Sequence, residues 1–466
     1  MAENDEQKSH VAMFPWLALG HMIPYLELAK LIAQRGHRIS YITTPRNIDR
    51  LPKLPSNLSP LITFVKIPLP HSENLPKDAE CTSDLPLESV CYLKKAYDLL
   101  QEPLTQFLQS SPPDWILFDF APYWLPAIAR KLNIANAFFS IFTAATVNFA
   151  CSPRGVEDYR AVSEDYTVTP NWIPFPSTVA FRYFEALKLF AGLTGSESNV
   201  SDIYRFVEVG RQCDLIVVRT CVEFEPEWLD ILGKFQHKPA MPVGVLAPTI
   251  NDNESDDGGS WQSIKDWLDK REKGSVVYIA FGSEAKPSQE ELSEIALGLE
   301  LSGLPFFWVL RKRRGLADTE LIELPDGFEQ RTKGRGVVFT DWAPQLRILA
   351  HDSVGGFLTH GGWSSVIEAL QFARPLLLLT YLADQGLNAK LLEEKMIGYV
   401  IPRNEQDGSF TRNSVAASLR LVVVEDEGKI YRAKAQEMRG LFGDRARQDG
   451  YVDNLLGFLN NNKKIK

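Results

Sequence analysis

The sequence WAPQLRILAHDSVGGFLTHGGWSSVIEALQFARPLLLLTYLADQ runs from Trp342 to Gln385 and holds the most informative pattern in this 466-residue chain. Its middle predicts a buried strand over residues 354–359, a tight turn at His360-Gly361-Gly362, and a helix over residues 364–373. Such a corner leaves backbone N–H groups free at the positive end of a helix dipole, which suits a phosphate. It is also an ordinary corner of a doubly wound sheet, so the turn alone leaves both interpretations open.

The whole stretch resembles the nucleotide-sugar box of plant UDP-dependent glycosyltransferases. The matching elements keep fixed spacings and are Trp342-Ala343-Pro344-Gln345, Ile348-Leu349, His351, Gly355, Phe357, Thr359-His360, Gly362-Trp363, Ser365, Glu368, Pro375 and Asp384-Gln385. The sequence departs from the family pattern where Gly361 replaces the usual Cys, Ser364 the usual Asn, and Leu379-Thr380 the usual Trp-Pro. Because the usual Asn helps to hold a phosphate, Ser364 bears on the strength of that contact rather than on the fold.

This resemblance implies where a UDP-sugar donor binds. It places the uracil on Trp342, the edge of the base at the backbone of Gln345, and the ribose hydroxyls at Glu368. The residues that it assigns to the phosphates are His360, Ser364 and Ser365, and those assigned to the sugar hydroxyls are Asp384 and Gln385. Its remaining donor-binding positions are Ala343, Gly362, Trp363, Ser283 at the diphosphate and Thr143 at the sugar.

The first residues predict a strand-helix-strand unit, with strands over 10–16 and 38–43 and a helix that starts at His21. Parallel strands bind ligands at their carboxyl ends, and His21 lies at that edge. A lone histidine is more often structural or merely exposed. However, Gly20-His21-x-x-Pro24 resembles the opening of the same family, in which the matching histidine is the general base.

A second candidate for chemistry is Asp119, which ends the apolar strand over residues 113–118. An aspartate at this place either caps a helix or pairs with a histidine. In the family, the matching aspartate holds the catalytic histidine, so the resemblance implies that Asp119 orients His21. The chemistry needs such a pair, because a hydroxyl is a poor nucleophile until a base takes its proton.

Composition narrows the class of protein. Hydrophobic residues make up 45% of the chain and charged residues 23%, as in folded globular proteins, and the net charge of −9 argues against nucleic acid as a partner. The five cysteines fit neither a zinc site nor a disulfide framework. The polar start is unlike a signal peptide, and no run of about 18 apolar residues predicts a membrane span. We therefore expect a cytoplasmic protein. We also expect it to be a monomer.

Other segments leave more open. Residues 51–87 predict a loop, 93–108 one amphipathic helix, 241–246 a strand, and 425–441 and 451–460 the last two helices. Aromatic residues between prolines over residues 154–193 suit the wall of an acceptor pocket, and they suit equally a flap packed on the core.

The predicted fold is α/β, with two doubly wound, Rossmann-like domains facing each other across a cleft, the GT-B arrangement that the resemblance implies. The expected units are residues 1–246 for the acceptor, a linker over 247–260, residues 261–440 for the donor, and a C-terminal helix and tail over 441–466 that packs back toward the first domain. No cofactor is expected, since the UDP-sugar is a substrate. No metal is expected either, because no Asp-x-Asp pair is placed for one.

The predicted function is inverting transfer of a sugar, with glucose expected, from a UDP-sugar to a hydroxyl of a small plant metabolite. The segments 12–16 and 383–389 resemble the branch that extends sugars on flavonoids or terpenoids, which includes rhamnosyltransferases, so UDP-rhamnose is the alternative donor. A dehydrogenase would need a Gly-x-Gly-x-x-Gly turn and an esterase a Gly-x-Ser-x-Gly elbow, and both are missing. A non-catalytic nucleotide-sugar binder would not need His21 and Asp119.

Overall fold

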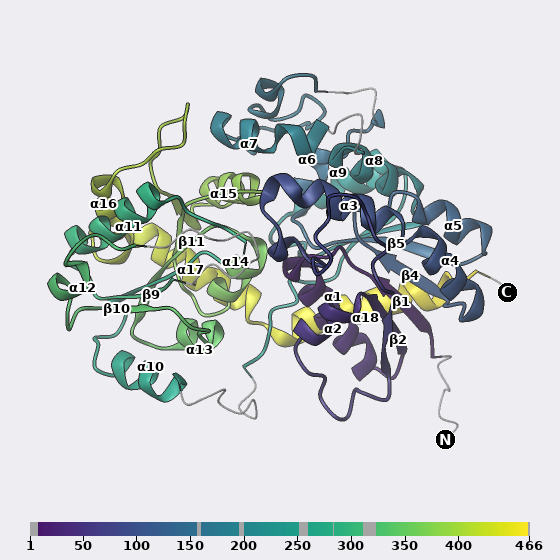
Figure 1. The fold of residues 1–466 in the computed structure, drawn as a ribbon, viewed down its shortest axis with the longest axis horizontal. Coiled ribbons are helices and arrows are strands. Elements are labelled where there is room, and N and C mark those ends of the chain that lie inside the picture. Colours follow the sequence, from purple (N-terminus) through teal and green to yellow (C-terminus); the bar gives the residue numbers. More distant parts are fainter. Residues whose placement is uncertain are drawn as a thin grey trace.

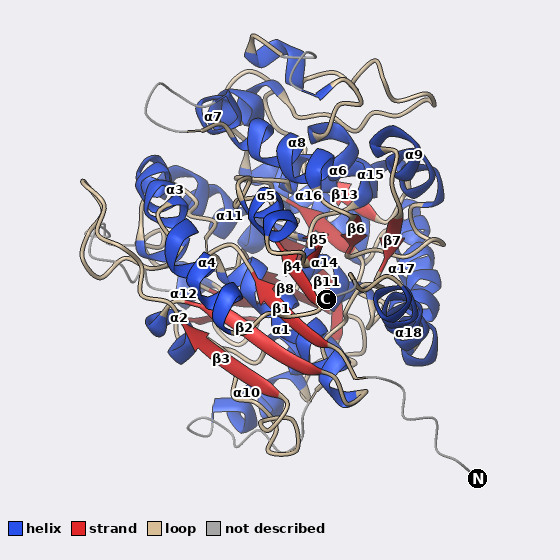
Figure 2. Ribbon diagram, turned by 90° about the vertical axis from the view of Figure 1, so that its right-hand side faces the viewer, coloured by secondary structure: helices blue, strands red, loops and turns tan. Residues whose placement is uncertain are grey.

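The computed structural model describes residues 8–155, 160–194, 200–250, 260–282, 284–310 and 323–464. In this part of the chain two parallel sheets lie side by side, each flanked by helices (Figure 1 and Figure 2). Every strand pairing in both sheets is parallel, so each connection between neighbouring strands crosses a face of the sheet.

The first sheet has seven strands among the described residues, in the order β3-β2-β1-β4-β5-β6-β7. Their bounds are β1 His10–Phe14, β2 Arg38–Thr43, β3 Ile62–Lys66, β4 Trp115–Phe118, β5 Ala135–Ser140, β6 Leu215–Val218 and β7 Ala240–Pro242. The helices of this half are α1 Leu19–Gln34, α2 Pro45–Arg50, α3 Val90–Asp98, α4 Gln101–Ser110, α5 Leu125–Lys131, α6 Ala144–Ala150, α7 Tyr183–Thr194, α8 Asp202–Gln212 and α9 Pro226–Gln236.

The second sheet has six strands in the described part of the chain, in the order β10-β9-β8-β11-β12-β13. Their bounds are β8 Val276–Ala280, β9 Phe306–Val309, β10 Gly336–Phe339, β11 Val354–Thr359, β12 Leu376–Leu378 and β13 Gly398–Val400. The helices that follow the first domain are α10 Ser260–Leu268, α11 Gln289–Ser302, α12 Phe328–Arg331, α13 Gln345–Ala350, α14 Trp363–Leu370, α15 Gln385–Glu394, α16 Arg412–Val423, α17 Lys429–Phe442 and α18 Arg445–Asn461.

The central strands form where the sequence is continuously apolar. All residues of β1, β4, β5, β6 and β8 are buried, as expected for parallel strands covered by helices on both faces. Side-chain caps then set where several helices begin: Thr143 accepts a hydrogen bond at the start of α6, Ser288 at α11 and Asp444 at α18. The buried strands and the capped helices thus fix the positions of the loops that follow the carboxyl ends of the strands.

Each sheet has one point at which its strand order reverses. In the first sheet this point lies between β1 and β4, where Phe14 pairs with Phe118. In the second sheet it lies between β8 and β11, where Ala280 pairs with Thr359. Loops that leave two neighbouring strands at such a point turn to opposite faces and leave a crevice, which is where open α/β sheets bind ligands.

The last helix joins the two halves. After α17, which packs beside α14 in the second half, the chain crosses over and α18 packs against α1 under the first sheet (Figure 1). The indole Nε1 of the buried Trp115 donates to the carbonyl of Leu459 at 2.8 Å, and Ser9 Oγ lies 2.6 Å from Asn460 Oδ1. The C-terminal helix is therefore part of the core of the first domain.

Two of the predicted elements differ from those observed in the first half. The predicted loop over residues 51–87 contains β3, an edge strand that is paired only with β2 and half exposed, so its sequence lacks a continuous apolar run. The single helix predicted over residues 93–108 is two helices, α3 and α4. Pro103 has no N–H to donate to the carbonyl of Leu99, so one continuous helix cannot form there.

Other boundaries also move. The strand predicted over residues 241–246 ends at Pro242, because Gly244 and Leu246 adopt left-handed backbone angles, φ +78° and +51°. The predicted helix over residues 425–441 starts with a 3₁₀ turn and becomes α17, while the last helix starts at Arg445, six residues before its expected start. Residues 251–259 of the predicted linker lie outside the described residues.

Candidate active site

His21 and Asp119 meet at the switch point of the first sheet. His21 lies in the first turn of α1 after β1, and Asp119 directly follows β4. Their Nδ1 and Oδ2 atoms are 2.7 Å apart. The fully buried Asp119 carboxylate also accepts hydrogen bonds from the backbone N–H groups of Trp16 at 3.2 Å and Phe120 at 2.8 Å. The helix-capping interpretation of Asp119 is wrong, because the next helix, α5, has Trp124 at its N-cap.

The environment of His21 suits a base. Burial lowers the pKa of His21. The charge and hydrogen bond of Asp119, with the charges of Glu284 and Asp384, raise it by more, so the pKa of His21 is raised overall. With the Nδ1 proton directed at Asp119, Nε2 keeps its lone pair, and no described residue hydrogen-bonds to it. The rings of Phe120 and Phe142 lie 5.9 and 5.2 Å from the imidazole and wall it on two sides.

Thr143 and Asp384 come together through a residue that the sequence analysis missed. Asn388 Nδ2 donates to Asp384 at 2.8 Å and to the carbonyl of Gly361 at 3.1 Å. Its Oδ1 lies 3.5 Å from the buried Thr143 hydroxyl across the domain contact. The pKa of Asp384 is raised, because burial outweighs the hydrogen bond from Asn388 and the charge of His21, which both lower it. The spacing of Asp384 and Asn388, four residues along one helix face, is a signal that could have identified Asn388.

The turn between β11 and α14 has little room for side chains. His360 packs against two glycines: a Cβ on Gly282 would lie 2.9 Å from the imidazole Cε1, and one on Gly362 2.5 Å from Nε2. Gly361 has φ +84°, a left-handed conformation that favours glycine. Burial lowers the pKa of His360 to about 4, so the imidazole is neutral at pH 7. No side chain of the described residues caps the N-terminus of α14, whose N–H groups face the turn.

The start of α14 also contacts the first domain. Trp363 is buried, and its Nε1 donates to the carbonyl of Arg219 at 2.7 Å. The Ser364 hydroxyl accepts a hydrogen bond from the Arg219 guanidinium at 2.7 Å, and Ser365 is buried one residue further on. Arg219 follows β6 directly and was not expected from the sequence, because its partner Ser364 lies in the other domain.

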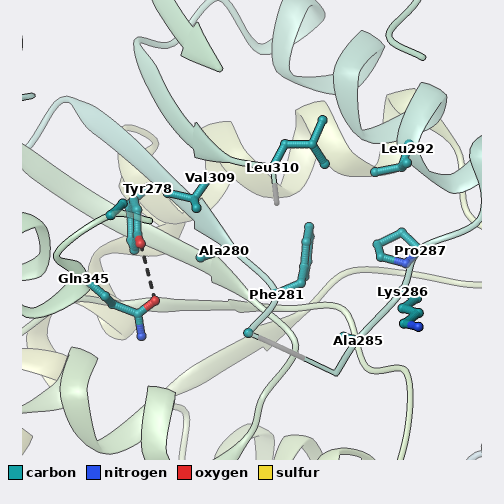
Figure 3. Close-up of a pocket in the computed structure, with 12 residues that line it drawn as sticks. Tyr278, Ala280, Phe281, Ala285, Lys286, Pro287, Leu292, Val309, Leu310 and Gln345 are labelled. Atoms are coloured by element: carbon teal, nitrogen blue, oxygen red, sulfur yellow. Dashed lines mark hydrogen bonds between the residues drawn. The ribbon is translucent and has the colours of Figure 1, made fainter. Parts of the chain in front are cut away.

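A small pocket opens beside the predicted nucleoside residues (Figure 3). Its lining includes Ala343, Gln345 and Tyr278, and the Tyr278 hydroxyl lies 3.3 Å from Gln345 Oε1. Gln345 Nε2 donates to Glu368 at 2.7 Å, and burial raises the pKa of this carboxyl. Trp342, at the edge of this region, is 57% exposed, so its indole is open to a planar ligand. These residues, expected from the resemblance to hold the nucleoside, therefore lie together.

The Gln385 amide is partly engaged by the backbone before it. Its side chain is buried, and Oε1 accepts hydrogen bonds from the backbone N–H groups of Tyr381 at 2.8 Å and Leu382 at 3.1 Å. These two hydrogen bonds occupy the amide oxygen, so it is not available to accept from a sugar hydroxyl. Only Nε2, which has no acceptor among the described residues, is left to donate. Ser283, expected at the diphosphate, lies outside the described residues.

Thr380, which replaces the usual Pro, uses its hydroxyl in a contact between the two domains. Its hydroxyl donates to Glu185, a buried residue of α7 in the first domain. A Cβ on Gly386 would meet the same carboxylate, so Glu185 also packs on the first turn of α15. The aromatic segment around it packs inward: Tyr166, Phe181 and Phe184 are buried. These three aromatic residues therefore pack on the core, which favours the interpretation of the segment as a flap.

Within the described residues, no group of three or more His, Cys, Asp or Glu side chains is arranged to hold a metal ion. None of the described helices is long and apolar enough to cross a membrane.

Comparisons with known proteins define the class of this chain. Residues 237–446 match the family model described as UDP-glucoronosyl and UDP-glucosyl transferase. UDP-glycosyltransferase 91A1 of Arabidopsis thaliana is 56% identical over 99% of this chain and 98% of its own length. Soyasaponin III rhamnosyltransferase of Glycine max is 44% identical over 98% of this chain and 96% of its own. The crystal structure of UDP-glucose: anthocyanidin 3-O-glucosyltransferase in complex with UDP superposes with a TM-score of 0.78 at 24% identity, covering 98% of this chain and 100% of that one.

The fold is thus GT-B, as predicted, and the sequence relatives show that the chain is a glycosyltransferase. The chain belongs to the plant family 1 UDP-glycosyltransferases.

Proposed function

We propose that this enzyme transfers glucose from UDP-glucose to a hydroxyl group on a sugar that a flavonoid or terpenoid already carries. The observation that supports transfer most directly is the His21–Asp119 pair, 2.7 Å apart, in which Asp119 is fully buried and Nε2 of His21 has no hydrogen-bond partner among the described residues. A protein that only bound a nucleotide-sugar would have no use for a histidine whose proton is held on the far nitrogen.

The reaction is a single displacement. Nε2 of His21 takes the proton of the acceptor hydroxyl while that oxygen attacks the anomeric carbon, and the bond from this carbon to the diphosphate oxygen breaks with its electron pair leaving on UDP. Asp119 stabilises the imidazolium that forms. Because the base belongs to the first domain and the turn before α14 to the second, the acceptor and UDP occupy opposite faces of the sugar. The anomeric configuration therefore inverts.

The leaving diphosphate needs stabilisation, for which we propose no metal and no cofactor. The uncapped N-terminus of α14 offers backbone N–H groups and the positive end of the helix dipole. His360 is neutral, since its pKa is lowered to about 4, and it acts as a hydrogen-bond donor rather than a cation. Donor groups fixed before the reaction begins cost no reorganisation during it.

The preference for glucose rests on Gln385 and Asp384. The amide Nε2 of Gln385 donates, and the Asp384 carboxylate accepts, so the pair suits neighbouring hydroxyls of the sugar. Galactose inverts carbon 4, and rhamnose lacks the hydroxyl on carbon 6, so each leaves one of these groups unpaired. Rhamnose is nevertheless the second candidate, because soyasaponin III rhamnosyltransferase is 44% identical to this chain.

The acceptor lies against the domain of residues 1–246 and the donor against that of residues 261–440. Beside His21, the rings of Phe120, Phe142 and Phe206 pack on one another with centroids 4.7–6.1 Å apart, an apolar wall suited to an aglycone. One copy of the chain carries both halves of the site, so we propose that a monomer is active.

UDP release tests the proposal. UDP-glucose, UDP-galactose and UDP-rhamnose would each be incubated with a flavonol, its 3-O-glucoside, a triterpene and its monoglycoside. We expect UDP release from UDP-glucose only with the glycosides, and a β-linked disaccharide by NMR from the α-configured donor. If UDP is released faster from UDP-rhamnose than from UDP-glucose, the preferred donor is UDP-rhamnose and the glucose assignment is wrong. UDP binding with no release from any pair would make the protein a binder rather than a transferase.

A further inference from the structure

Arg219 is a buried cation at the contact between the two domains. It follows β6 and is 2% exposed. Its guanidinium donates from Nε to the carbonyl of Val245 at 2.9 Å, from Nη2 to that of Leu246 at 3.4 Å, and from Nη1 to the Ser364 hydroxyl at 2.7 Å. Every group that it contacts is neutral.

A buried positive charge is stabilised by a nearby negative charge. No carboxylate of the described residues forms an ion pair with Arg219, and burial lowers its pKa to about 10, with the more distant Glu368 and Glu27 favouring the charged form. The side chain is therefore still protonated at pH 7. A cation kept out of water without a paired anion is costly, and that cost falls when a ligand brings negative charge close by.

The contact with Ser364 indicates where an anion would bind. Arg219 donates to Ser364 Oγ, so the hydroxyl uses a lone pair on the guanidinium and keeps its own hydrogen for a ligand. Ser364 is in the first turn of α14, where no described side chain caps the free N–H groups. A hydroxyl that accepts from a cation is a stronger donor, because hydrogen bonds in a chain polarise one another.

We propose that Arg219 is a positioning residue for the diphosphate of the donor: it fixes the Ser364 hydroxyl as a donor to a phosphate oxygen and supplies the positive charge behind it. This inference rests on the proposed function, since it takes UDP as the ligand. It also accounts for the serine at position 364. Where an asparagine amide would reach the phosphate directly, the shorter serine relies on the guanidinium behind it.

The assignment predicts an effect that grows with the number of phosphates. Uridine, UMP and UDP would be titrated calorimetrically into the full chain and into Arg219→Gln. We expect UDP to bind about ten- to a hundredfold more weakly to the variant, the usual size of a lost charge-assisted contact, and uridine to bind within twofold of the wild type. Equal losses for all three ligands would show that Arg219 only ties the domains together.

Two further variants keep the test decisive if Arg219→Gln does not fold. Ser364→Ala leaves the guanidinium bonded to Val245 and Leu246 and should show the same phosphate-dependent loss, whereas an unchanged UDP affinity would overturn the inference. Arg219→Gln combined with Ser364→Asn should recover most of the UDP affinity, because the amide reaches the phosphate without help. A wild type that binds no UDP would instead overturn the proposed function.

Discussion

Replacing Asp119 by Asn tests the centre of the proposed mechanism. The carboxylate accepts three hydrogen bonds, from His21 Nδ1 and the N–H groups of Trp16 and Phe120, at 2.7, 3.2 and 2.8 Å. An asparagine has one oxygen, so its NH₂ group must face at least one of these donors. If it faces His21, the imidazole must turn its Nδ1 lone pair toward the amide and place its proton on Nε2, where a base is needed.

We therefore expect turnover to fall by about two to four orders of magnitude, the range that covers loss of a general base and of the correct tautomer. The pH dependence should change as well. Asp119 raises the pKa of His21, which acts only when deprotonated, so wild-type activity should rise with pH through a midpoint above the ordinary histidine value of 6.5. In Asp119→Asn this midpoint should move to lower pH while the plateau drops.

The assay is UDP release from UDP-glucose over a pH series, with UDP affinity as the check on folding. Asp98→Asn is a matched control, since Asp98 pairs with the buried Arg205 at 2.6 Å in the same domain and forms no hydrogen bond with His21. That variant should lose thermal stability and keep its pH midpoint. If Asp119→Asn turns over at the wild-type rate with an unshifted midpoint, Asp119 serves only to hold the backbone of Trp16 and Phe120.

Three other substitutions test neighbouring parts of the site. His21→Ala should keep the fold and UDP affinity while transfer falls by about two to four orders of magnitude, and turnover within a few-fold of the wild type would exclude His21 as the base. Gln385→Glu keeps the acceptor for Tyr381 and Leu382 but removes the Nε2 donor, so UDP-glucose turnover should fall about tenfold or more with UDP affinity unchanged. An equal loss with every UDP-sugar would show that Gln385 does not select the donor. Glu185→Gln weakens the bond that joins α7 to Thr380, and a lower melting temperature is expected, whereas an unchanged one would show that this contact adds nothing to stability.

How far the sequence predicts the site depends on how far each residue acts through its own strand. Asp119 directly follows β4 and His21 lies in the first turn of the helix after β1. The switch-point rule places such residues at one edge, so their meeting is foreseeable once β1 and β4 are known to be neighbours. Arg219 and Ser364 meet only because the two domains dock, and nothing within β6 or α14 alone encodes that contact. Gln385 could be located by its motif, but not the direction in which its amide oxygen points.

The fold shows the same division. Continuously apolar strands such as β4 can be located from their sequence, while the half-exposed edge strand β3 has too weak a pattern to separate it from the loop around it. The split between α3 and α4 could have been predicted from Pro103 alone.

The position of α18 has a consequence for synthesis on the ribosome. The first sheet is translated long before residues 445–461, which cover one of its faces and accept the hydrogen bond of Trp115. The first domain, although translated before the second, is thus completed after it, and its uncovered apolar surface stays exposed until α18 has been made. A chain that stops at Asp444 should bind a hydrophobic dye and aggregate, and adding a peptide of residues 445–464 in trans should reduce both.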